Sequence, residues 1–434
     1  MCKGDRQMNR SIYQMSRDEL LAEKEALVAE YEKIKAEGLS LDMSRGKPCR
    51  EQLDLSDGML TILKSGEDCA DSKGFDTRNY GVISGIPDAR KLFADLCGVN
   101  VEKVFVGGNA SLTLMYDTVA RAEIFGVAHG ATPWSKCEKV KFLCPAPGYD
   151  RHFKICETFG IEMIPIEMNE NGPDMDTIEK LVSTDDTIKG IWCVPKHSNP
   201  TGAVYSDETV KRFAALKPAA KDFRIFWDNA YIVHDLYENT PKLLNIFDLI
   251  RGTENEDMVY MFTSTSKITH AGSGVSAFIT SENNMKHDLE YLNAQLISYD
   301  KVNQLRHVKF FGDANGILEH MKKHANILRP RFEVVLEAFE KHFSGREIAT
   351  WTKPTGGYFI SLDITKGSAK RVYELCLNAG VKLTNVGATF PYGNDPKDAN
   401  LRIAPSYPPI EELKKAAEVL CLCVKLSAVE AALA

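Results

Sequence analysis

Two kinds of hydrophobic spacing divide this chain of 434 residues. Residues 16–38 carry apolar side chains at helical spacing, and Ser16 can cap a helix there because Glu19 follows three residues later. The apolar stripe consists of Leu20, Leu27, Tyr31 and Ile34. We therefore predict an amphipathic N-terminal helix that docks on the main body of the protein.

From about residue 85 the pattern changes to short apolar runs that alternate with helical stretches. The predicted strands are Val104–Val106, Val140–Leu143, Ile188–Val194, Arg224–Trp227 and Val259–Phe262. The predicted helices include Pro87–Cys97, Asp150–Phe159, Ser206–Leu216 and Leu243–Ile250. Strands that alternate with helices predict a mostly parallel sheet with helices on both faces.

A long helix, Gly316–His342, then leads to a smaller segment that mixes helix and strand. We predict an α/β fold whose large domain, residues 61–315, has a mostly parallel, seven-stranded type of sheet between helices. Residues 316–434 form a small α+β domain, which the N-terminal helix and segment of residues 1–60 join.

Four of the predicted strands lead into chemically distinctive sequences: PAPGYD, PKHSNPTG, DNAY and STSK in chain order. The carboxyl ends of parallel strands meet at one edge of a sheet, where ligands bind. The last sequence ends on Lys267, a single lysine in a hydroxyl-rich loop after a buried strand. That setting suits an amine that must be desolvated and held still, although an exposed loop lysine is the plain alternative for this stretch alone.

The strand Val104–Val106 runs into Gly107 and Gly108 and then into a helical stretch. This order directs free backbone N–H groups toward an anion. The loop is neither a P-loop nor a dinucleotide-binding fingerprint, because it lacks the Gly-Lys-Ser/Thr ending and the glycine spacing that those motifs need.

Composition narrows the function classes further. A net charge of −7 disfavours nucleic-acid binding, and the eleven cysteines follow no metal or disulfide spacing, as expected in a reducing compartment. No apolar run approaches the roughly 18 residues that cross a membrane, and the polar N-terminus does not resemble a signal peptide. We expect a cytoplasmic protein without membrane or nucleic-acid partners.

In chain order, NPTG after residue 198, DNAY after residue 227, STSK after residue 263 and the late Arg402 resemble the motifs of fold-type I pyridoxal-phosphate aminotransferases. SRGKP, SKITHAGSGV and YDKVNQLRH resemble a bacterial aspartate aminotransferase subgroup, often labelled Ic. The resemblance covers nearly the whole chain and implies pyridoxal 5'-phosphate as cofactor.

By this resemblance Lys267 would hold the cofactor as a Schiff base and act as general base and acid. Asp228 would keep the ring nitrogen protonated, and Tyr231 and Asn199 would donate hydrogen bonds to the phenolic oxygen. Tyr149 would stack on the ring face. The plain alternatives are a turn or cap for Asp228 and a turn tyrosine for Tyr149.

The resemblance also implies a phosphate site and a homodimer. The N–H groups of Asn109, Ala110 and Ser111 would bind the phosphate, together with the hydroxyls of Ser111 and Ser264. Tyr80 would reach the phosphate from the neighbouring subunit, so that the dimer shares its active sites.

One departure concerns the phosphate. The family usually places an arginine just past the second glycine after the lysine, where this chain has Gly274. No arginine lies between Arg251 and Arg306, a gap that the subgroup shares. Either backbone and hydroxyl donors suffice, or another cation substitutes, with His270 and Lys196 as candidates.

The second departure concerns the substrate. Arg402 would bind its α-carboxylate as a planar fork, which lysine could not imitate. The arginine that better-known aspartate enzymes offer to the distal carboxylate falls near Ala294 here. Arg45 is the preferred replacement, Lys301 and Arg306 are the other candidates, and each could instead be an ordinary surface cation.

These features predict an aminotransferase that moves an amino group between L-aspartate and 2-oxoglutarate, giving oxaloacetate and L-glutamate. A transaminase for aromatic or aliphatic amino acids is the first alternative. A regulator that keeps the fold to sense an effector is disfavoured, because roughly forty leading residues leave little room for a DNA-binding domain. The missing glycine fingerprint disfavours an NAD-dependent dehydrogenase.

Overall fold

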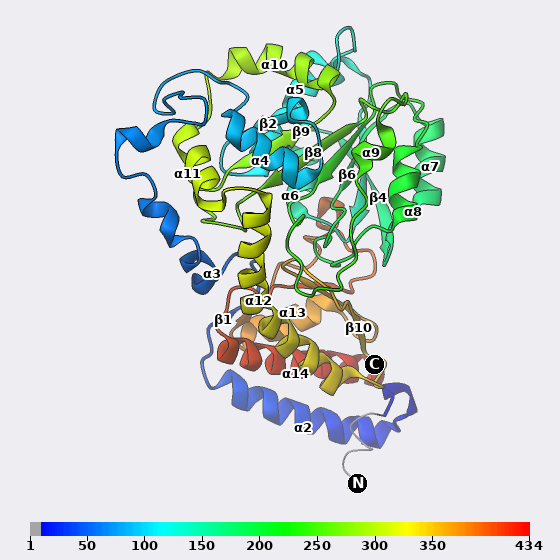
Figure 1. Cartoon of the computed structure of the whole chain (residues 1–434). Coiled ribbons are helices and arrows are strands. Elements are labelled where there is room, and N and C mark those ends of the chain that lie inside the picture. Colours follow the sequence, from blue (N-terminus) through cyan, green and yellow to red (C-terminus); the bar gives the residue numbers. More distant parts are fainter. Residues whose placement is uncertain (1–9) are drawn as a thin grey trace.

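The computed structural model describes residues 10–434, which form two lobes connected by one long helix (Figure 1). Residues 1–9, where the sequence predicts no signal peptide, lie outside the described residues. Within the described part, no helix is long and apolar enough to span a membrane.

The larger lobe is built on one sheet with the strand order β2-β9-β8-β7-β6-β3-β4-β5. Neighbouring strands are parallel except where β9 pairs with β2 and β8, and where β5 pairs with β4. The strands are β2 (Val104–Val106), β3 (Lys141–Ala146), β4 (Glu162–Asn169), β5 (Gly172–Pro173), β6 (Ile188–Cys193), β7 (Arg224–Asp228), β8 (Val259–Ser264) and β9 (Ser276–Ile279). The predicted mostly parallel sheet is confirmed, and the two-residue β5 adds an edge to its seven longer strands.

Each face of this sheet has its own apolar core. Along β7, Ile225 and Trp227 belong to one cluster and Phe226 to the other, because successive side chains of a strand point to opposite faces. The covering helices are α4 (Pro87–Cys97), α7 (Met175–Thr184), α8 (Asp207–Ala214), α9 (Ile246–Ile250) and α11 (Lys301–Phe311) on one face, and α5 (Ser111–Phe125), α6 (Asp150–Phe159) and α10 (Glu282–Gln295) on the other.

The smaller lobe combines the two ends of the chain. Helix α2 (Arg17–Lys35), capped by Ser16 as predicted, packs against α14 (Ile410–Leu433), and Tyr31 donates a hydrogen bond to the carbonyl of Leu375. The other elements are α3 (Arg50–Asp54), α12 (Ala314–Phe343), α13 (Ala369–Asn378), and strands β1 (Leu41–Asp42), β10 (Ala349–Trp351), β11 (Ile360–Ile364), β12 (Val381–Lys382) and β13 (Asn400–Ile403). Strand β1 pairs with β12 in parallel, and this pairing joins the N-terminal segment to the smaller lobe. The predicted domain limits at residues 60 and 315 stay a prediction.

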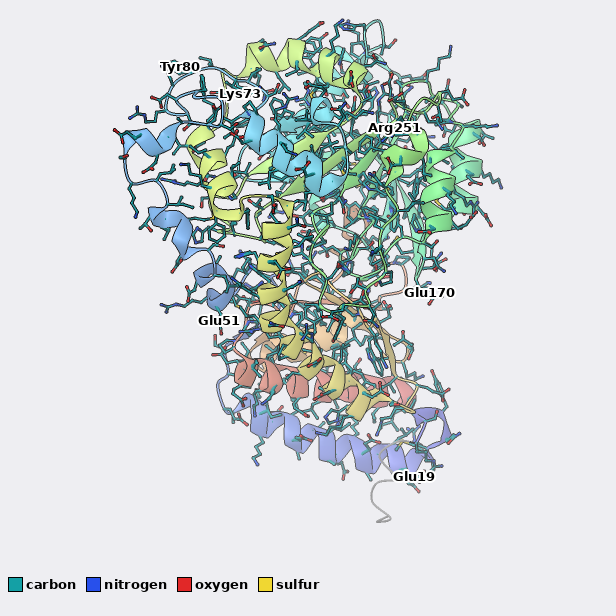
Figure 2. The ribbon with its side chains drawn as sticks, in the orientation of Figure 1. Glu19, Glu51, Lys73, Tyr80, Glu170 and Arg251 are labelled. Carbon is teal, nitrogen blue, oxygen red and sulfur yellow. The ribbon has the colours of Figure 1, made fainter. Side chains whose placement is uncertain are left out.

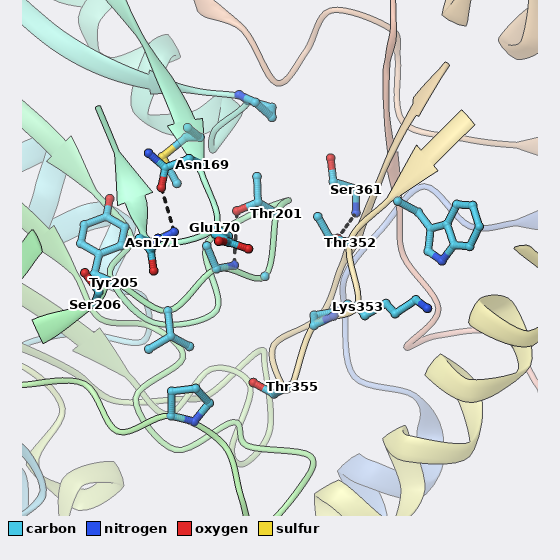
Figure 3. Close-up of a pocket in the computed structure, with 18 of the residues that line it drawn as sticks. Asn169, Glu170, Asn171, Thr201, Tyr205, Ser206, Thr352, Lys353, Thr355 and Ser361 are labelled. Atoms are coloured by element: carbon cyan, nitrogen blue, oxygen red, sulfur yellow. Dashed lines mark hydrogen bonds between the residues drawn. The ribbon is translucent and has the colours of Figure 1, made fainter. Parts of the chain in front are cut away.

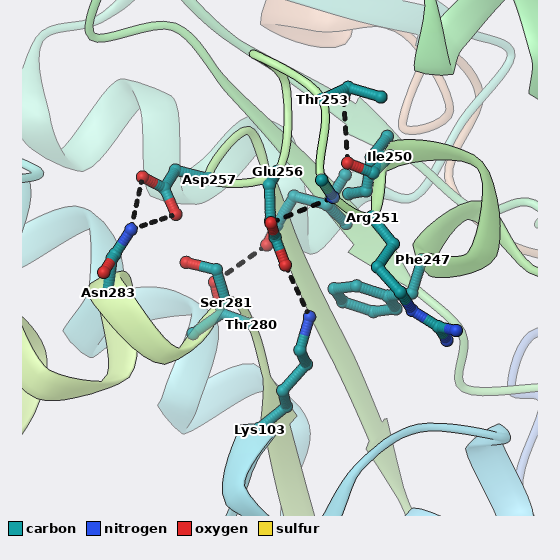
Figure 4. A network of polar contacts seen from close by, with 12 residues as sticks. Lys103, Phe247, Ile250, Arg251, Thr253, Glu256, Asp257, Thr280, Ser281 and Asn283 are labelled. Carbon is teal, nitrogen blue, oxygen red and sulfur yellow. Dashed lines mark hydrogen bonds and ion pairs between the residues drawn. The ribbon is translucent and has the colours of Figure 1, made fainter.

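A polar network lies at the end of the sheet where strands β2 and β8 begin (Figure 4). Lys103, just before β2, forms an ion pair with Glu256 at 3.1 Å, and the hydroxyl of Thr280 donates to the carbonyl of Val259 at 2.9 Å. These contacts fix the strands at the end opposite to the loops that follow their carboxyl ends. Those loops can therefore carry function without also holding the sheet together.

Candidate active site

The loops at the carboxyl ends of β3, β6, β7 and β8 meet at a cavity of about 190 Å³. Among its lining residues are Ala110, Ser111, Tyr149, Asn199, Asp228, Tyr231, Ser264, Ser266 and Lys267. The sheet thus brings together residues that are far apart in sequence. For example, the hydroxyl of Ser266 donates a hydrogen bond to the carbonyl of Asn109, 157 positions earlier in the chain.

Buried neutral groups hold the backbone around Lys267. The hydroxyl of Tyr358 and Nε2 of His234 each lie 3.4 Å from the Lys267 carbonyl oxygen. Nε2 of His320 lies 2.9 Å from the carbonyl of the next residue, Ile268. Burial lowers the pKa of His234 and of His320, so these imidazoles donate hydrogen bonds without adding positive charge near the amine.

A further histidine, His307, binds side chains on both sides of Lys267 in the same loop. Nε2 of His307 lies 2.9 Å from the hydroxyl of Thr265 and 3.0 Å from that of Thr269, while Nδ1 lies 2.8 Å from the carbonyl of Asn303. A carbonyl can only accept, so Nδ1 carries the proton and Nε2 accepts. Burial lowers the pKa of His307 to about 4, which keeps this arrangement neutral at ordinary pH.

Asp228, the last residue of β7, has a buried carboxylate, and only 3% of the residue's surface is exposed. Its Oδ2 lies 3.0 Å from Nε2 of His152, whose ring stacks on Trp192 at 4.3 Å between centroids. Its Oδ1 is buried without a hydrogen-bond partner among the described residues. A buried, unpaired carboxylate oxygen at a cavity wall is costly unless a donor from a ligand reaches it.

Two tyrosines flank the lysine amine and the carboxylate. Nζ of Lys267 lies 4.9 Å from the centroid of the Tyr231 ring. Burial raises the pKa of Tyr149 to about 12, and burial together with the charge of Asp228 raises that of Tyr231. Both phenols therefore stay protonated and can donate hydrogen bonds.

The predicted phosphate loop lies at the start of α5, with Ala110 as the N-cap residue and Ser111 as the first helical residue. The hydroxyls of Ser264 and Ser266 lie 3.1 Å apart in the facing loop. Helix α5 therefore presents free N–H groups and the positive end of its dipole to the cavity.

Gly274 packs closely on two backbone segments at the place where the family usually has an arginine. A Cβ there would lie 3.0 Å from the carbonyl oxygen of Asn109 and 3.0 Å from the backbone nitrogen of Ser266. The candidate replacements lie elsewhere: Lys196 pairs with Asp235 at 2.8 Å, and His270 pairs with Asp57 at 3.5 Å. Neither is among the lining residues of the cavity.

Arg402, on β13 of the smaller lobe, reaches the same region. Its Nη1 lies 3.4 Å from the side-chain oxygen of Asn199 and 2.8 Å from Oδ1 of Asp150. Its Nε donates to the hydroxyl of Thr384 at 3.4 Å, and its guanidinium stacks on Phe359 at 4.9 Å. The arginine is thus fixed between the two lobes.

Arg45 and Tyr80 lie outside the cavity lining. Arg45 is exposed, but its neighbour Gly46 packs so closely on the ring of Phe359 that a Cβ would lie 2.3 Å from it. The segment of Arg45 therefore contacts the ring on which Arg402 stacks. Tyr80 is 76% exposed and projects at the edge of the larger lobe (Figure 2).

A larger cavity of about 750 Å³ lies between the lobes (Figure 3). Its walls include residues 169–171 and 201–207 of the larger lobe and residues 351–355 of the smaller one. Among its described lining residues there is neither an arginine nor a histidine, and its lysines, Lys242 and Lys353, are exposed. Chemistry, rather than size, therefore identifies the smaller cavity as the candidate active site.

Comparisons with known proteins agree with this geometry. The model of the aspartate amino-transferase family matches residues 15–434. An aspartate aminotransferase of Corynebacterium glutamicum is 47% identical over 406 residues, which are 94% of this chain and 94% of that protein. This chain belongs to the aspartate aminotransferase family.

Solved structures of aminotransferases have the same fold as this chain. The crystal structure of an aspartate transaminase from Corynebacterium glutamicum has a TM-score of 0.94 and 45% identity, covering 97% of this chain and 99% of that one. An α-aminoadipate aminotransferase from Thermus thermophilus, crystallised with N-(5'-phosphopyridoxyl)-L-leucine, has a TM-score of 0.72 at 18% identity and shows the fold alone. The chain is thus a fold-type I, pyridoxal-phosphate-dependent aminotransferase.

The residues of this aminotransferase fit its cofactor. The unpaired Oδ1 of Asp228 needs a donor such as a protonated ring nitrogen, and the free N–H groups at the start of α5 suit a phosphate. Lys267 supplies an amine to the same cavity, and Tyr149 supplies an aromatic face.

Several site residues were not found from the sequence. His152, Trp192, Tyr358 and the supporting histidines act through contacts with residues far along the chain; His152 and Asp228, for example, are 76 positions apart. The available signal for His152 was its place three residues after Tyr149, at helical spacing from the predicted stacking residue. Asp150 belongs to the distinctive PAPGYD sequence, but nothing in the sequence links it to Arg402.

The neutral state of His307 predicts acid sensitivity. Its pKa is about 4 in the folded protein and 6.5 ordinarily, so between these pH values the unfolded chain binds more protons and acidification favours unfolding. His307 alone contributes up to about 3 kcal/mol of unfolding free energy at neutral pH, and this contribution is lost as pH falls from about 6.5 to 4.

Denaturant unfolding of the wild type and of His307→Gln between pH 7 and pH 4.5 measures the contribution of His307 to the free energy of unfolding. The variant should be less stable at pH 7 and should lose less stability on acidification. His129→Gln, which changes a largely exposed histidine, should keep the wild-type pH dependence. A His307→Gln profile parallel to that of the wild type would contradict the neutral buried imidazole.

Proposed function

We propose that this aminotransferase transfers the amino group of L-aspartate to 2-oxoglutarate, giving oxaloacetate and L-glutamate. The observation that carries the proposal is the fixed guanidinium of Arg402, held beside Asn199 at the mouth of a cavity that also contains Lys267 and Asp228. The relative named aspartate aminotransferase, 47% identical to this chain, supports the choice of aspartate.

Lys267 would hold the cofactor covalently, with Asp228 at the ring nitrogen, Tyr149 on the ring face, and Ala110 and Ser111 at the phosphate. When bound, pyridoxal phosphate withdraws electrons from the α-carbon of the substrate, which makes its proton removable. The nearly buried carboxylate of Asp228 favours a positive charge beside it and so supports this role.

Lys267 would also move the proton. Its amine lies beside the Tyr231 ring and its backbone is held by Tyr358 and His234, so the amine can swing while the chain beneath it stays fixed. A general base has to be placed within hydrogen-bond reach of the proton that it takes. The amine lies 4.9 and 5.8 Å from the ring centroids of Tyr231 and Tyr358, and it has no carboxylate partner among the described ion pairs.

Two cations would recognise the two carboxylates of aspartate. Arg402 would bind the α-carboxylate, which every amino acid carries. Arg45 would bind the distal carboxylate, which only dicarboxylic substrates carry, and the contact between Gly46 and Phe359 supports its nearness to Arg402.

A substrate panel tests the proposal directly. Purified enzyme is given aspartate, alanine, leucine or phenylalanine with 2-oxoglutarate, and glutamate formation is measured. Aspartate should have the largest kcat/KM. A larger kcat/KM for leucine or phenylalanine would instead favour a transaminase for aliphatic or aromatic amino acids.

Replacing Arg45 with alanine should reduce kcat/KM for aspartate far more than for alanine. A distal carboxylate without its cation loses on the order of 2–5 kcal/mol, which corresponds to a loss of roughly 30-fold to several-thousand-fold. Arg402→Ala should harm both substrates alike. The matched control is Arg50→Ala, an exposed arginine on the same segment, which should leave both values unchanged. Equal losses for aspartate and alanine in Arg45→Ala would move the role to Lys301 or Arg306.

We also propose a homodimer in which Tyr80 binds the phosphate of the neighbouring subunit, in a cytoplasmic enzyme. The unusual backbone after Tyr80 supports a specific role: Val82 has a φ of 58°, which β-branched residues seldom adopt. The free, mostly buried cysteines among the described residues suit a reducing compartment.

Mixing inactive Tyr80→Phe and Lys267→Ala chains should restore part of the activity, because one site of each mixed dimer then has both wild-type groups. The control mixture is Lys267→Ala with Asp228→Asn. Both changes lie on the same side of a shared site, so no complete site can form and no activity should return. Recovery no greater than in this control, in dimers shown to exchange subunits, would argue against the shared site.

A further inference from the structure

Asp150 forms an ion pair with Arg402, the arginine that the proposed function assigns to the α-carboxylate. Oδ1 of Asp150 lies 2.8 Å from Nη1 of Arg402. Among the described residues neither side chain has another ion-pair partner. The pair joins the first residue of α6 to β13, elements of different lobes, at the edge of the candidate active site.

The two partners differ in their freedom to move. The Arg402 side chain is only 9% exposed and is also held by Thr384 and by stacking on Phe359. The Asp150 side chain is 34% exposed, and no second side chain among residues 10–434 binds it. A carboxylate that already faces water can leave its partner and be hydrated at small cost, whereas a buried guanidinium cannot.

A substrate carboxylate at Arg402 would meet the guanidinium that Asp150 already binds. Two parallel N–H groups of a guanidinium bind a carboxylate most strongly, and Nη1 already donates to Asp150. The second group on Nη1, the side-chain oxygen of Asn199, is uncharged and more distant at 3.4 Å. Asp150 therefore places a negative charge directly against Arg402, where it opposes a second carboxylate.

We propose that Asp150 is an internal competitor for Arg402, which the α-carboxylate of an amino acid or 2-oxo acid displaces on binding. This inference rests on the proposed function of Arg402. Binding is then an exchange of one carboxylate for another at a permanently paired guanidinium. Asp150 weakens the binding of every carboxylate substrate and product, whatever its side chain, and so eases product release.

The test measures binding of propionate, which has one carboxylate and neither an amino nor an oxo group, to the purified holoenzyme by calorimetry at fixed ionic strength. Asp150→Asn removes the charge and keeps the shape, and propionate should bind about 3- to 30-fold more tightly, the range expected for losing a partly exposed ionic competitor. Asp150→Glu keeps the charge and should bind propionate as the wild type does. Asp207→Asn is the matched control, because Asp207 is the exposed first residue of α8 and should have no effect.

Steady-state kinetics separate competition from positioning. In Asp150→Asn the KM values for aspartate and alanine should fall by similar factors with kcat unchanged, because the α-carboxylate contact is the same in the ground and transition states. Unchanged or weaker propionate binding, or a rise in KM, would overturn the proposal and make Asp150 a positioning residue for Arg402. Asp150→Ser removes the same charge and decides the matter if the asparagine variant does not fold.

Wild-type turnover of aspartate tests the proposed function separately. Tighter propionate binding in Asp150→Asn, in an enzyme that prefers another amino acid, would reject aspartate as substrate and keep the role of Asp150.

Discussion

The site depends on one buried charge, the carboxylate of Asp228. Burying a carboxylate is expensive unless its oxygens meet hydrogen-bond donors or a positive charge. Here β7 carries Asp228 to the edge of the sheet, and His152, stacked on Trp192, binds one of its oxygens. The other oxygen has no partner among the described residues, and in the proposed function it accepts a hydrogen bond from a protonated ring nitrogen of the cofactor. The aromatic packing of the sheet thus indirectly supports the reaction.

The loop that carries Lys267 is held by uncharged groups, in contrast to the carboxylate of Asp228. An amine that has to lose and regain a proton cannot be held by a carboxylate, since that partner would keep it protonated. The chain instead fixes the lysine loop by its backbone carbonyls and hydroxyls, using Tyr358 and buried imidazoles as donors. The ion pair of Arg402 with Asp150 lies near Asn199, one of the residues that line the cavity.

Local signals explain which parts could be predicted from the sequence. Helix α4 begins and ends as predicted, because Pro87 suits a first helical position and Gly98 adopts a left-handed φ of 62° at its end. Strand β4 was not predicted, since its outer positions are exposed and Pro165 interrupts the pattern. Helices α10 and α11 carry many polar residues and so lack a clear apolar stripe. Asp150 and Arg402 lie 252 residues apart, and only the fold brings them together.

The most direct test of the whole account is the position of the covalent bond to the cofactor. The purified protein is reduced with tritiated borohydride, digested, and its labelled peptide sequenced by mass spectrometry. The account predicts that visible absorbance is bleached and that the phosphopyridoxyl group is found on Lys267 alone. Label on another lysine, such as the buried Lys196 in the loop after β6, or a protein with no reducible chromophore after incubation with pyridoxal phosphate, would contradict it.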